Sequence, residues 1–393
     1  MKYSLSDICE YGKGKVAVFS LTKTSYVSTE NMLPNRGGIT EAASLPTFDQ
    51  TQAYVSDDVL VSNIRPYFKK IWFAEHDGGC SNDVLVFRAK KGVSPRFLYY
   101  VLSDDAFFDY SMSTSKGTKM PRGDKAALMK YGVPCFSLDE QERIAGILDA
   151  LDKKIKLNTK INENLEQQAL ALFRLYFMNY HPYGGSAPSN WEEVTLDDVC
   201  VRITDGSHYS PPDAPDAPYP MYSVKDMETY GFSSSSCKHI TAEEFHKMQK
   251  NDCVPRFNDI LVAKDGSYLK EIFICSEEKD EAILSSIAIF RPNTEIIMPE
   301  ILLYLLKQPS VRKDVGDNYV SGSALPRIVL KDFKKYTFFL PPMTEQLKIG
   351  SVLHAIRMQT KANIDEIQKL SSLRDILLPR LMSGELSVSE LDL

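Results

Sequence analysis

The most regular pattern in the chain is an apolar stripe that advances by alternating steps of four and three residues. Two asparagines interrupt it, and its positions are Ile144, Leu148, Leu151, Ile155, Asn158, Asn162, Leu165, Ala169, Leu172 and Tyr176. This spacing is typical of a helix that buries one narrow stripe against a partner helix. The pattern therefore predicts one long α-helix over residues 137–181.

A second stripe repeats the first one with a constant offset of 205 residues. It consists of Ile349, Leu353, Ile356, Thr360, Asn363, Ile367, Leu370, Arg374, Leu377 and Leu381. The same offset relates Pro121-Arg122 to Pro326-Arg327. The sequence therefore indicates a tandem duplication. In each copy a globular segment, 1–136 or 182–341, is followed by a helical segment, 137–181 or 342–393.

Two long helices with matching stripes bury those stripes most simply against each other. A helix of about 40 residues spans on the order of 60 Å, which is the length of a spacer. Asn158 and its counterpart Asn363 fall within the stripes, where a polar residue lowers stability but fixes the register of a helix pair. The alternative is a pair of ordinary amphipathic helices inside one core.

The two globular segments share an order of predicted elements. A strand, a turn and a second strand are expected at 57–74, and another hairpin at 258–270. A buried strand follows at 83–88 and at 286–291, and then a helix with proline in its first turn at 95–102 and at 299–306. The predicted fold class is α+β, with two mixed α/β segments separated by two long helices.

Composition places the chain among ordinary globular proteins, with 393 residues that are 43% hydrophobic and 25% charged. The start of the chain lacks a signal-peptide core, and no run of about 18 apolar residues occurs. We therefore expect a cytoplasmic protein without a membrane partner. The seven cysteines are scattered and never form a C-x-x-C arrangement, which favours buried thiols over disulfides or a metal site.

The net charge of −6 argues against a general nucleic-acid binder. Residues 1–136 hold 17 Lys and Arg against 14 Asp and Glu, whereas residues 182–341 hold 17 against 24. Any contact with DNA must therefore depend on local basic patches or on a second subunit that supplies positive charge.

Candidate DNA-contacting residues gather at the two hairpin turns, at two glycine loops and at one Asp-Gly turn. A cation beside an aromatic or hydroxyl group on a loop suits contact with phosphates and base edges. The alternatives are solvated basic turns and plain glycine turns. The candidates are Arg65, Tyr67, Lys69, Lys70, Lys116, Thr118, Lys119, Arg122, Ser207, His208, Tyr209, Lys264, Tyr268, Lys270, Ser323 and Arg327.

Two Glu-Gln pairs precede the long helices, and they consist of Glu140, Gln141, Glu345 and Gln346. An acidic residue just before an apolar helical run suits an N-terminal cap. The same residues are candidates for contact with a partner protein, and we favour capping.

Taken in order, these motifs resemble the DNA specificity subunit of type I restriction-modification systems over the whole chain. The resemblance is carried by Asp205-Gly206-Ser207-His208, by the two Gly-(Thr/Ser)-x-x-Pro-Arg loops, by the Glu-Gln pairs and by the run Asp149–Ile155. It implies two target-recognition domains that each read half of a bipartite site in double-stranded DNA. It also implies antiparallel coiled-coil helices that set the gap between the halves, so four residues inserted after Asn162 should lengthen that gap.

The resemblance further implies partners that carry out the chemistry. Two DNA methyltransferase subunits are expected on the helices and restriction subunits beside them, with S-adenosylmethionine on the methyltransferase and no cofactor in this chain. The sequence offers little for catalysis, because Ser210-Pro211-Pro212-Asp213 ends in the wrong residue for an amino-methyltransferase. A nuclease built from Pro212-Asp213 and Glu277-Glu278-Lys279 has no counterpart in the first copy. The remaining alternative is a coiled-coil protein-interaction scaffold without DNA specificity.

Overall fold

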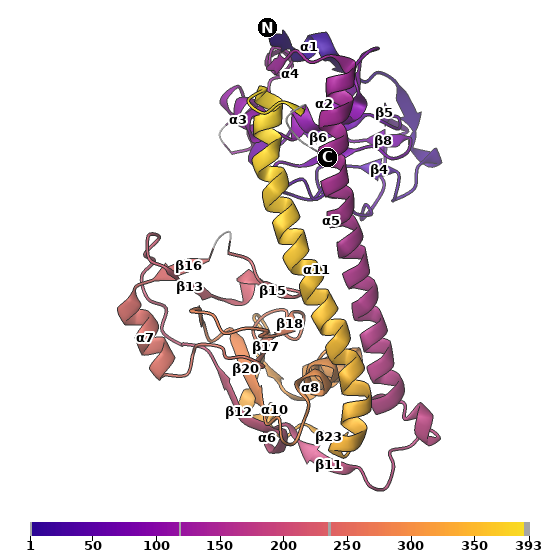
Figure 1. Cartoon of the computed structure of the whole chain (residues 1–393). Coiled ribbons are helices and arrows are strands. Elements are labelled where there is room, and N and C mark those ends of the chain that lie inside the picture. The colour runs from indigo at the N-terminus through magenta and orange to yellow at the C-terminus, as the bar shows by residue number, and fades with distance from the viewer. Residues whose placement is uncertain (1, 118, 235–236, 389–393) are drawn as a thin grey trace. The chain divides into compact units, whose positions relative to one another are not determined.

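The structure is a computed structural model that describes residues 2–117, 119–234 and 237–388 (Figure 1). The candidate residue Thr118 lies outside this range. The chain divides into two compact units. Unit 1 comprises Met1–Thr159 with Ile364–Leu393, and unit 2 comprises Lys160–Asn363. Two long helices, α5 (Leu138–Phe173) and α11 (Met343–Ser383), each contribute a segment to both units.

A four-stranded antiparallel sheet with the same strand order forms the centre of each unit. In unit 1 the order is β2 (Cys9–Tyr11), β9 (Val84–Ala89), β6 (Val59–Ser62) and β7 (Ile71–Phe73). In unit 2 it is β12 (Cys200–Asp205), β20 (Ile287–Pro292), β17 (Ile260–Ala263) and β18 (Ile272–Ile274). The predicted hairpins and buried strands are therefore confirmed in both copies.

An arginine–aspartate pair beside the sheet recurs in both units. The buried carboxylate of Asp58 accepts hydrogen bonds from Arg88 Nε at 2.8 Å and Nη2 at 2.7 Å. The equally buried Asp259 accepts from the same two atoms of Arg291, both at 2.8 Å. A two-point pair of this kind satisfies a buried carboxylate that would otherwise be costly. Its recurrence supports the duplication that the sequence indicates.

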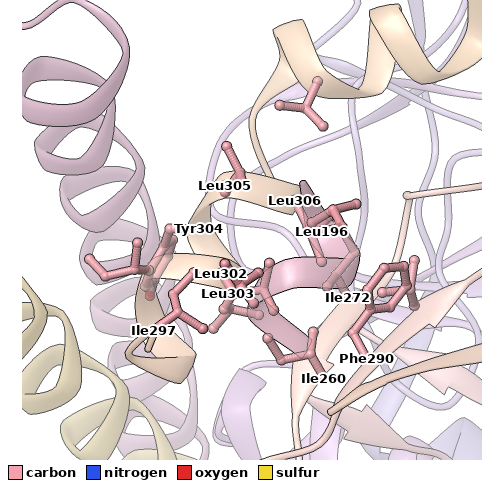
Figure 2. Close-up of a cluster of buried hydrophobic side chains, with 14 of the residues drawn as sticks. Leu196, Ile260, Ile272, Phe290, Ile297, Leu302, Leu303, Tyr304, Leu305 and Leu306 are labelled. Carbon is pink, nitrogen blue, oxygen red and sulfur yellow. The ribbon is translucent and has the colours of Figure 1, made fainter. Parts of the chain in front are cut away.

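One helix covers each sheet, as the proline-led runs predict. They are α2 (Pro95–Ser103) in unit 1 and α8 (Pro299–Leu306) in unit 2. Every residue of α8 is buried. Figure 2 shows Leu302 and Leu303 of α8 beside Ile260 of the sheet, within one apolar cluster. Apart from Glu300, the helix is apolar on all sides because none of its sides is left to solvent.

The remaining strands form smaller sheets and ribbons around the two central ones. In unit 1 they are β3 (Lys15–Ala17), β5 (Gln50–Tyr54), β8 (Gly78–Cys80) and β4 (Tyr26–Val27) in one sheet, with β1 (Lys2–Ser4) paired to β10 (Gly132–Pro134). In unit 2 they are β16 (Lys238–Ile240), β13 (Tyr219–Tyr222) and β19 (Ala282–Ile283), with the pairs β11 (Glu192–Thr195) and β23 (Thr337–Leu340), β14 (Met227–Glu228) and β15 (Gly231–Phe232), and β21 (Val320–Ser321) and β22 (Arg327–Ile328).

Short helices complete both units, and several of them begin with a polar side-chain cap. Unit 1 holds α1 (Leu5–Ile8), α3 (Asp105–Ser113) and α4 (Lys125–Leu128), and unit 2 holds α6 (Leu196–Val199), α7 (Ala242–Lys250), α9 (Pro309–Asn318) and α10 (Leu330–Phe333). The counterparts α1 and α6 begin with the same device, a reciprocal capping box between Ser4 and Asp7 or between Thr195 and Asp198.

Within unit 1, α5 and α11 lie side by side and run antiparallel. Arg374 Nη1 of α11 contacts Asp152 Oδ1 at 3.0 Å, and Glu366 Oε2 accepts a hydrogen bond from Asn158 Nδ2 at 2.7 Å. The N-terminal part of α5 and the last turns of α11 share the apolar cluster of unit 1, in which Leu148 and Leu381 are fully buried.

Within unit 2 the same two helices are joined by an asparagine pair. Asn363 Nδ2 donates to Asn162 Oδ1 at 2.7 Å, and both side chains are buried. The asparagines of the stripes therefore satisfy their polar groups across the helix pair.

The first helix differs from the prediction at its end, and the second contains a proline. The first helix ends at Phe173, eight residues before the predicted end, and Arg174–Met178 forms one π-helical turn. This turn brings Phe177 against Trp191, with ring centroids 5.7 Å apart. The second helix contains Pro379 in its interior, and proline cannot donate the backbone hydrogen bond of a regular turn.

Candidate nucleic-acid interface

In both units the turn of the central hairpin lies against the glycine loop. In unit 1 Arg65 donates its backbone N–H to the carbonyl of Pro121 at 2.9 Å, and Ile64 forms a β-bridge with Arg122. In unit 2 Gly266 donates to Pro326 at 2.7 Å, and Asp265 forms the bridge with Arg327. We call these arrangements loop pair 1 (63–70 with 115–122) and loop pair 2 (264–270 with 320–328).

The glycine loops are themselves tight hairpins. Gly117 and Gly322 have φ of 94° and 88°, which residues with a side chain rarely adopt. A Cβ atom at Gly322 would also lie 2.8 Å from the carbonyl oxygen of Leu325. Each hairpin exposes one apolar side chain before its Pro-Arg, and these are Met120 at 47% and Leu325 at 54%.

The four candidate residues in the hairpin turn of unit 1 differ in the contacts that their side chains make. Lys69 Nζ forms an ion pair with Asp105 at 2.9 Å, and Lys70 Nζ donates to the carbonyl of Thr29 at 2.7 Å. Burial lowers the pKa of Lys70. Tyr67 is exposed, at 48%. Arg65 has a φ of +51° and a buried Nε that no acceptor in the described chain reaches.

Two of the three basic side chains of the first glycine loop lie beside a carboxylate. Lys116 Nζ lies 2.8 Å from Asp124, whose pKa is lowered chiefly by that hydrogen bond. Arg122 Nη2 lies 3.1 Å from Asp83. Lys119 is exposed. Loop pair 1 therefore combines fixed cations, free cations and an exposed aromatic ring.

The structure places Lys264 of unit 2 in the interior, where the sequence suggested an exposed hairpin tip. Its side chain is 9% exposed and its ammonium group contacts the carboxylate of Asp205. The reason is that its backbone N–H is bonded to Ser286 at 3.0 Å and its carbonyl accepts from Ile328 at 3.0 Å, which turns the side chain inward. Lys264 therefore stabilises loop pair 2 from the interior of unit 2.

The other candidates of unit 2 differ in exposure. Tyr268 is half-buried under Arg312, 6.0 Å from its ring, whereas Lys270 is exposed and lies 3.4 Å from Glu271. Ser323 and Arg327 are both exposed. Loop pair 2 thus presents its polar groups mainly from the glycine loop.

The Asp-Gly turn of unit 2 presents two of its three predicted residues. Ser207 is buried, and its Oγ donates to the carbonyl of Tyr209 at 2.7 Å. His208 is 78% exposed, with Nε2 at 3.3 Å from Asp205 Oδ1. Tyr209 is 56% exposed. Because Asp205 contacts both His208 and Lys264, the turn is linked to loop pair 2.

Sequence reasoning missed several residues that shape the loop pairs. Asp83 was assigned only to a strand, Met120 and Leu325 were passed over as loop residues, and Asp265 has a buried Oδ1 without a hydrogen-bond partner in the described chain. An apolar residue at the same position in both glycine loops was a signal that the sequence did contain.

The residues proposed for capping or partner contact make contacts inside the chain. Glu140 accepts from the backbone and hydroxyl of Ser137, both at 2.8 Å, and these hydrogen bonds lower its pKa. Glu345 binds Lys348 at 2.6 Å and Tyr183 at 3.2 Å. Capping is therefore observed at Glu140.

Gln141 and Gln346 share one role. They are buried, and their Oε1 atoms accept hydrogen bonds from the backbone N–H of Ser94 at 3.1 Å and of Met298 at 2.9 Å, just before α2 and α8. Each glutamine therefore fixes a long helix to the globular part of its own unit.

The motifs weighed for catalysis are engaged in other contacts. Asp213 accepts from the backbone of His239 at 3.0 Å, and Glu277 pairs with Lys279 at 3.1 Å. Over the described residues, no group of three His, Cys, Asp or Glu side chains is placed to hold a metal ion. Within that same part of the chain, every helix is too short or too polar to cross a membrane.

Comparison with known proteins gives one consistent family. The sequence model of the type I restriction modification DNA specificity domain matches residues 1–167 and again residues 188–371. The chain is 26% identical over 316 residues to the MjaIX specificity subunit of Methanocaldococcus jannaschii, which covers 77% of this chain and 71% of that protein. It is 23% identical over 457 residues to the HindI specificity subunit of Haemophilus influenzae, covering 98% and 99%. Among solved structures, the S subunit of a type I restriction-modification system from M. genitalium superposes with a TM-score of 0.61 at 16% identity, covering 97% and 96%, so the fold is shared.

Proposed function

The chain belongs to the type I restriction modification DNA specificity domain family, and we propose that each of its two units reads one part of a two-part DNA site. As a specificity subunit it recognises DNA sequence and is not itself the catalyst. The loop pairs are the surfaces proposed to make this contact. A rigid backbone frame that displays arginine, lysine and exposed apolar or aromatic side chains suits base edges and phosphates together.

The observation that carries the proposal is the recurrence of the loop pair. In both units a hairpin turn donates one backbone hydrogen bond to the proline carbonyl of a Pro-Arg sequence, whereas the side chains around that frame differ. A conserved frame with different side chains is what two readers of different sequences require. Chance surface turns would not share the hydrogen bond.

The spacer belongs to the same proposal. We assign it to α5 and α11 as an antiparallel coiled coil, in which Asn158 with Glu366 and Asn162 with Asn363 hold the register. A helix of 36 residues such as α5 is long enough to separate two readers by tens of ångströms.

The chemistry falls to other subunits in this proposal. DNA methyltransferase subunits dock on the helices, and the twofold repeat of the chain offers two such sites. S-adenosylmethionine binds to those subunits, and restriction subunits join the assembly for cleavage. Exposed apolar residues on the helices, such as Leu157, Ile161 and Leu373, support protein contact there.

Selection from a random DNA library tests this function. The chain is assembled with its methyltransferase subunits, and the bound DNA is sequenced. Two short defined blocks separated by a gap of fixed length are expected. Enrichment of no motif, with the assembly intact, would favour the alternative of a scaffold without DNA specificity.

A separate experiment tests the spacer. Because the asparagine pair shows which residues of the two helices lie opposite each other, both helices can be lengthened at matching positions. Seven residues are inserted into both helices, after Thr159 and after Asn363, so that the stripe and the antiparallel register are kept. The added rise of about 10 Å should lengthen the gap by about three base pairs. An equal insertion into the linker after Gly185 is the control and should leave the gap unchanged. A gap that ignores the paired insertion would refute the spacer.

A further inference from the structure

The two loop pairs differ in which carboxylate is available to their Pro-Arg arginine. In unit 1 Asp83 holds Arg122 at 3.1 Å. The backbone carbonyl of Asp83 accepts from Asn63 at 2.8 Å, and the equivalent bond in unit 2 joins Lys264 to Ser286 at 3.0 Å. Ser286 therefore occupies the place of Asp83. Unit 2 has no carboxylate at this position.

Arg327 is left free by this difference. The hydroxyl of Ser286 accepts from the backbone N–H of Val224 at 3.0 Å. The side chain of Arg327 is exposed and forms no ion pair or hydrogen bond with any described residue. Its backbone is fixed, because it pairs with both Ser321 and Asp265.

In unit 1 the free arginine lies on the other loop. Arg65 occupies the position that is Gly266 in unit 2, because each donates to the proline carbonyl of its own unit. The guanidinium of Arg65 has no ion pair or hydrogen bond within the described chain, and its Nε is shielded from solvent. Its φ of +51° is uncommon for a residue with a side chain. The terminal Nη atoms of Arg65 likewise have no partner in the described chain and, unlike Nε, they are not buried, so they can bind a group from outside the chain.

Resting on the proposed function, we infer that Arg65 reads a guanine in one half of the DNA site and that Arg327 reads a guanine in the other half. A free guanidinium presents two parallel donors that match O6 and N7 of guanine in the major groove. Arg122 is a positioning residue, since its guanidinium is already bound to Asp83 and its backbone closes the glycine loop. The arginine that reads the base therefore lies in the hairpin turn in unit 1 and in the glycine loop in unit 2.

Four variants test the assignment in the assembly with methyltransferase subunits. Arg65→Ala should relax one guanine in one half of the selected motif, and Arg327→Ala should relax one guanine in the other half. Binding to the original site should fall roughly 5- to 150-fold in each case. Lys91→Ala in unit 1 and Lys250→Ala in unit 2 are the controls, because both lysines are exposed and lie outside the loop pairs, and both variants should keep the motif.

A conservative variant separates base reading from phosphate contact. Arg65→Lys keeps the charge but loses the two-donor fork. Preference for the guanine should therefore weaken if Arg65 reads a base, whereas a phosphate contact would be kept and the motif would not change. Replacing that guanine with 7-deazaguanine, which lacks the N7 acceptor, should weaken binding of the wild-type chain and leave Arg65→Ala unaffected. Thermal unfolding of each variant confirms that it is folded.

The possible outcomes distinguish failure of this inference from failure of the proposed function. A wild-type two-part motif that survives Arg65→Ala and Arg327→Ala unchanged, or that weakens equally for all sequences, overturns the inference and leaves the function standing. A folded wild-type assembly that selects no motif overturns both.

Discussion

Replacing Glu300 with glutamine should destabilise unit 2 more than any change of similar size on its surface. Glu300 lies in α8 with 3% of its side chain exposed. Its Oε1 accepts from Arg357 Nε at 2.9 Å and contacts His354 Nδ1 at 2.8 Å, both on α11. The substitution keeps the shape and one acceptor but removes the negative charge that compensates the buried Arg357.

The magnitude follows from what remains around Arg357. The side chain of Arg357 is 9% exposed. Its Nη1 also donates to the hydroxyl of Ser276 at 3.1 Å, and this hydroxyl carries no charge. Removing one partner of a buried ion pair costs about 3–5 kcal/mol. Because glutamine still accepts one hydrogen bond, we expect about 3 kcal/mol, or a fall in melting temperature of about 6–12 °C for a unit of this size.

The two tryptophans make the measurement specific to one unit. Trp72 is buried in unit 1 and Trp191 in unit 2. A Trp72→Phe background leaves only the fluorescence of unit 2, so urea unfolding followed there reports the effect of Glu300→Gln. Glu277→Gln, whose ion pair with Lys279 is exposed, is the control and should change stability by less than about 1 kcal/mol.

A double variant separates lost charge from lost packing. Glu300→Leu with Arg357→Met removes both charges and fills the space, and should be close to neutral. If Glu300→Gln unfolds within about 0.5 kcal/mol of the parent, the argument from a buried unpaired arginine is refuted.

The other predictions concern the frame around the loop pairs. Gln346→Ala and Gln141→Ala each leave one buried backbone N–H without an acceptor, so urea unfolding should show losses of about 1–3 kcal/mol in the respective units. Gly322→Ala adds a Cβ where φ is positive and space is short, and it should destabilise unit 2 by about 1 kcal/mol or more in the same assay. Glu140 has a pKa below its ordinary 4.5, so its stabilising effect exists above that pH and is lost as the pH falls through the lower folded value. Glu140→Gln should therefore flatten the loss of stability between pH 6 and pH 3.

The duplication and the order of elements could be predicted from the sequence because they depend on spacing alone. The steps of the stripes, the proline-led helices and the alternating strands are local patterns, and α2, α8 and the two central sheets follow them. The contact between the hairpin turn and the glycine loop could not be predicted. It joins Arg65 to Pro121, residues far apart in the chain, and no local pattern encodes that pairing.

Exposure of individual side chains was the least predictable feature. Lys264 and Lys270 look alike in the sequence as basic residues of one hairpin, yet the ammonium of Lys264 is buried against Asp205 while that of Lys270 is in solvent. The difference arises because the backbone of Lys264 lies in the sheet ladder and its partner carboxylate comes from a distant strand. Ion pairing likewise separates Arg122 from Arg327, which occupy one motif position.

The two copies act as an internal comparison that separates frame from reader. Positions that keep their chemistry in both copies are buried and hydrogen-bonded, such as the Asp58–Arg88 and Asp259–Arg291 pairs, because losing either member leaves a costly buried charge. Two positions change at constant backbone: Arg65 to Gly266 lies in the loop pairs, and Asp83 to Ser286 lies beside them, joined by a backbone hydrogen bond to the first residue of each hairpin turn. Equivalent backbone hydrogen bonds therefore frame positions at which charged groups have been exchanged. Such an exchange is expected where each unit reads its own sequence of bases.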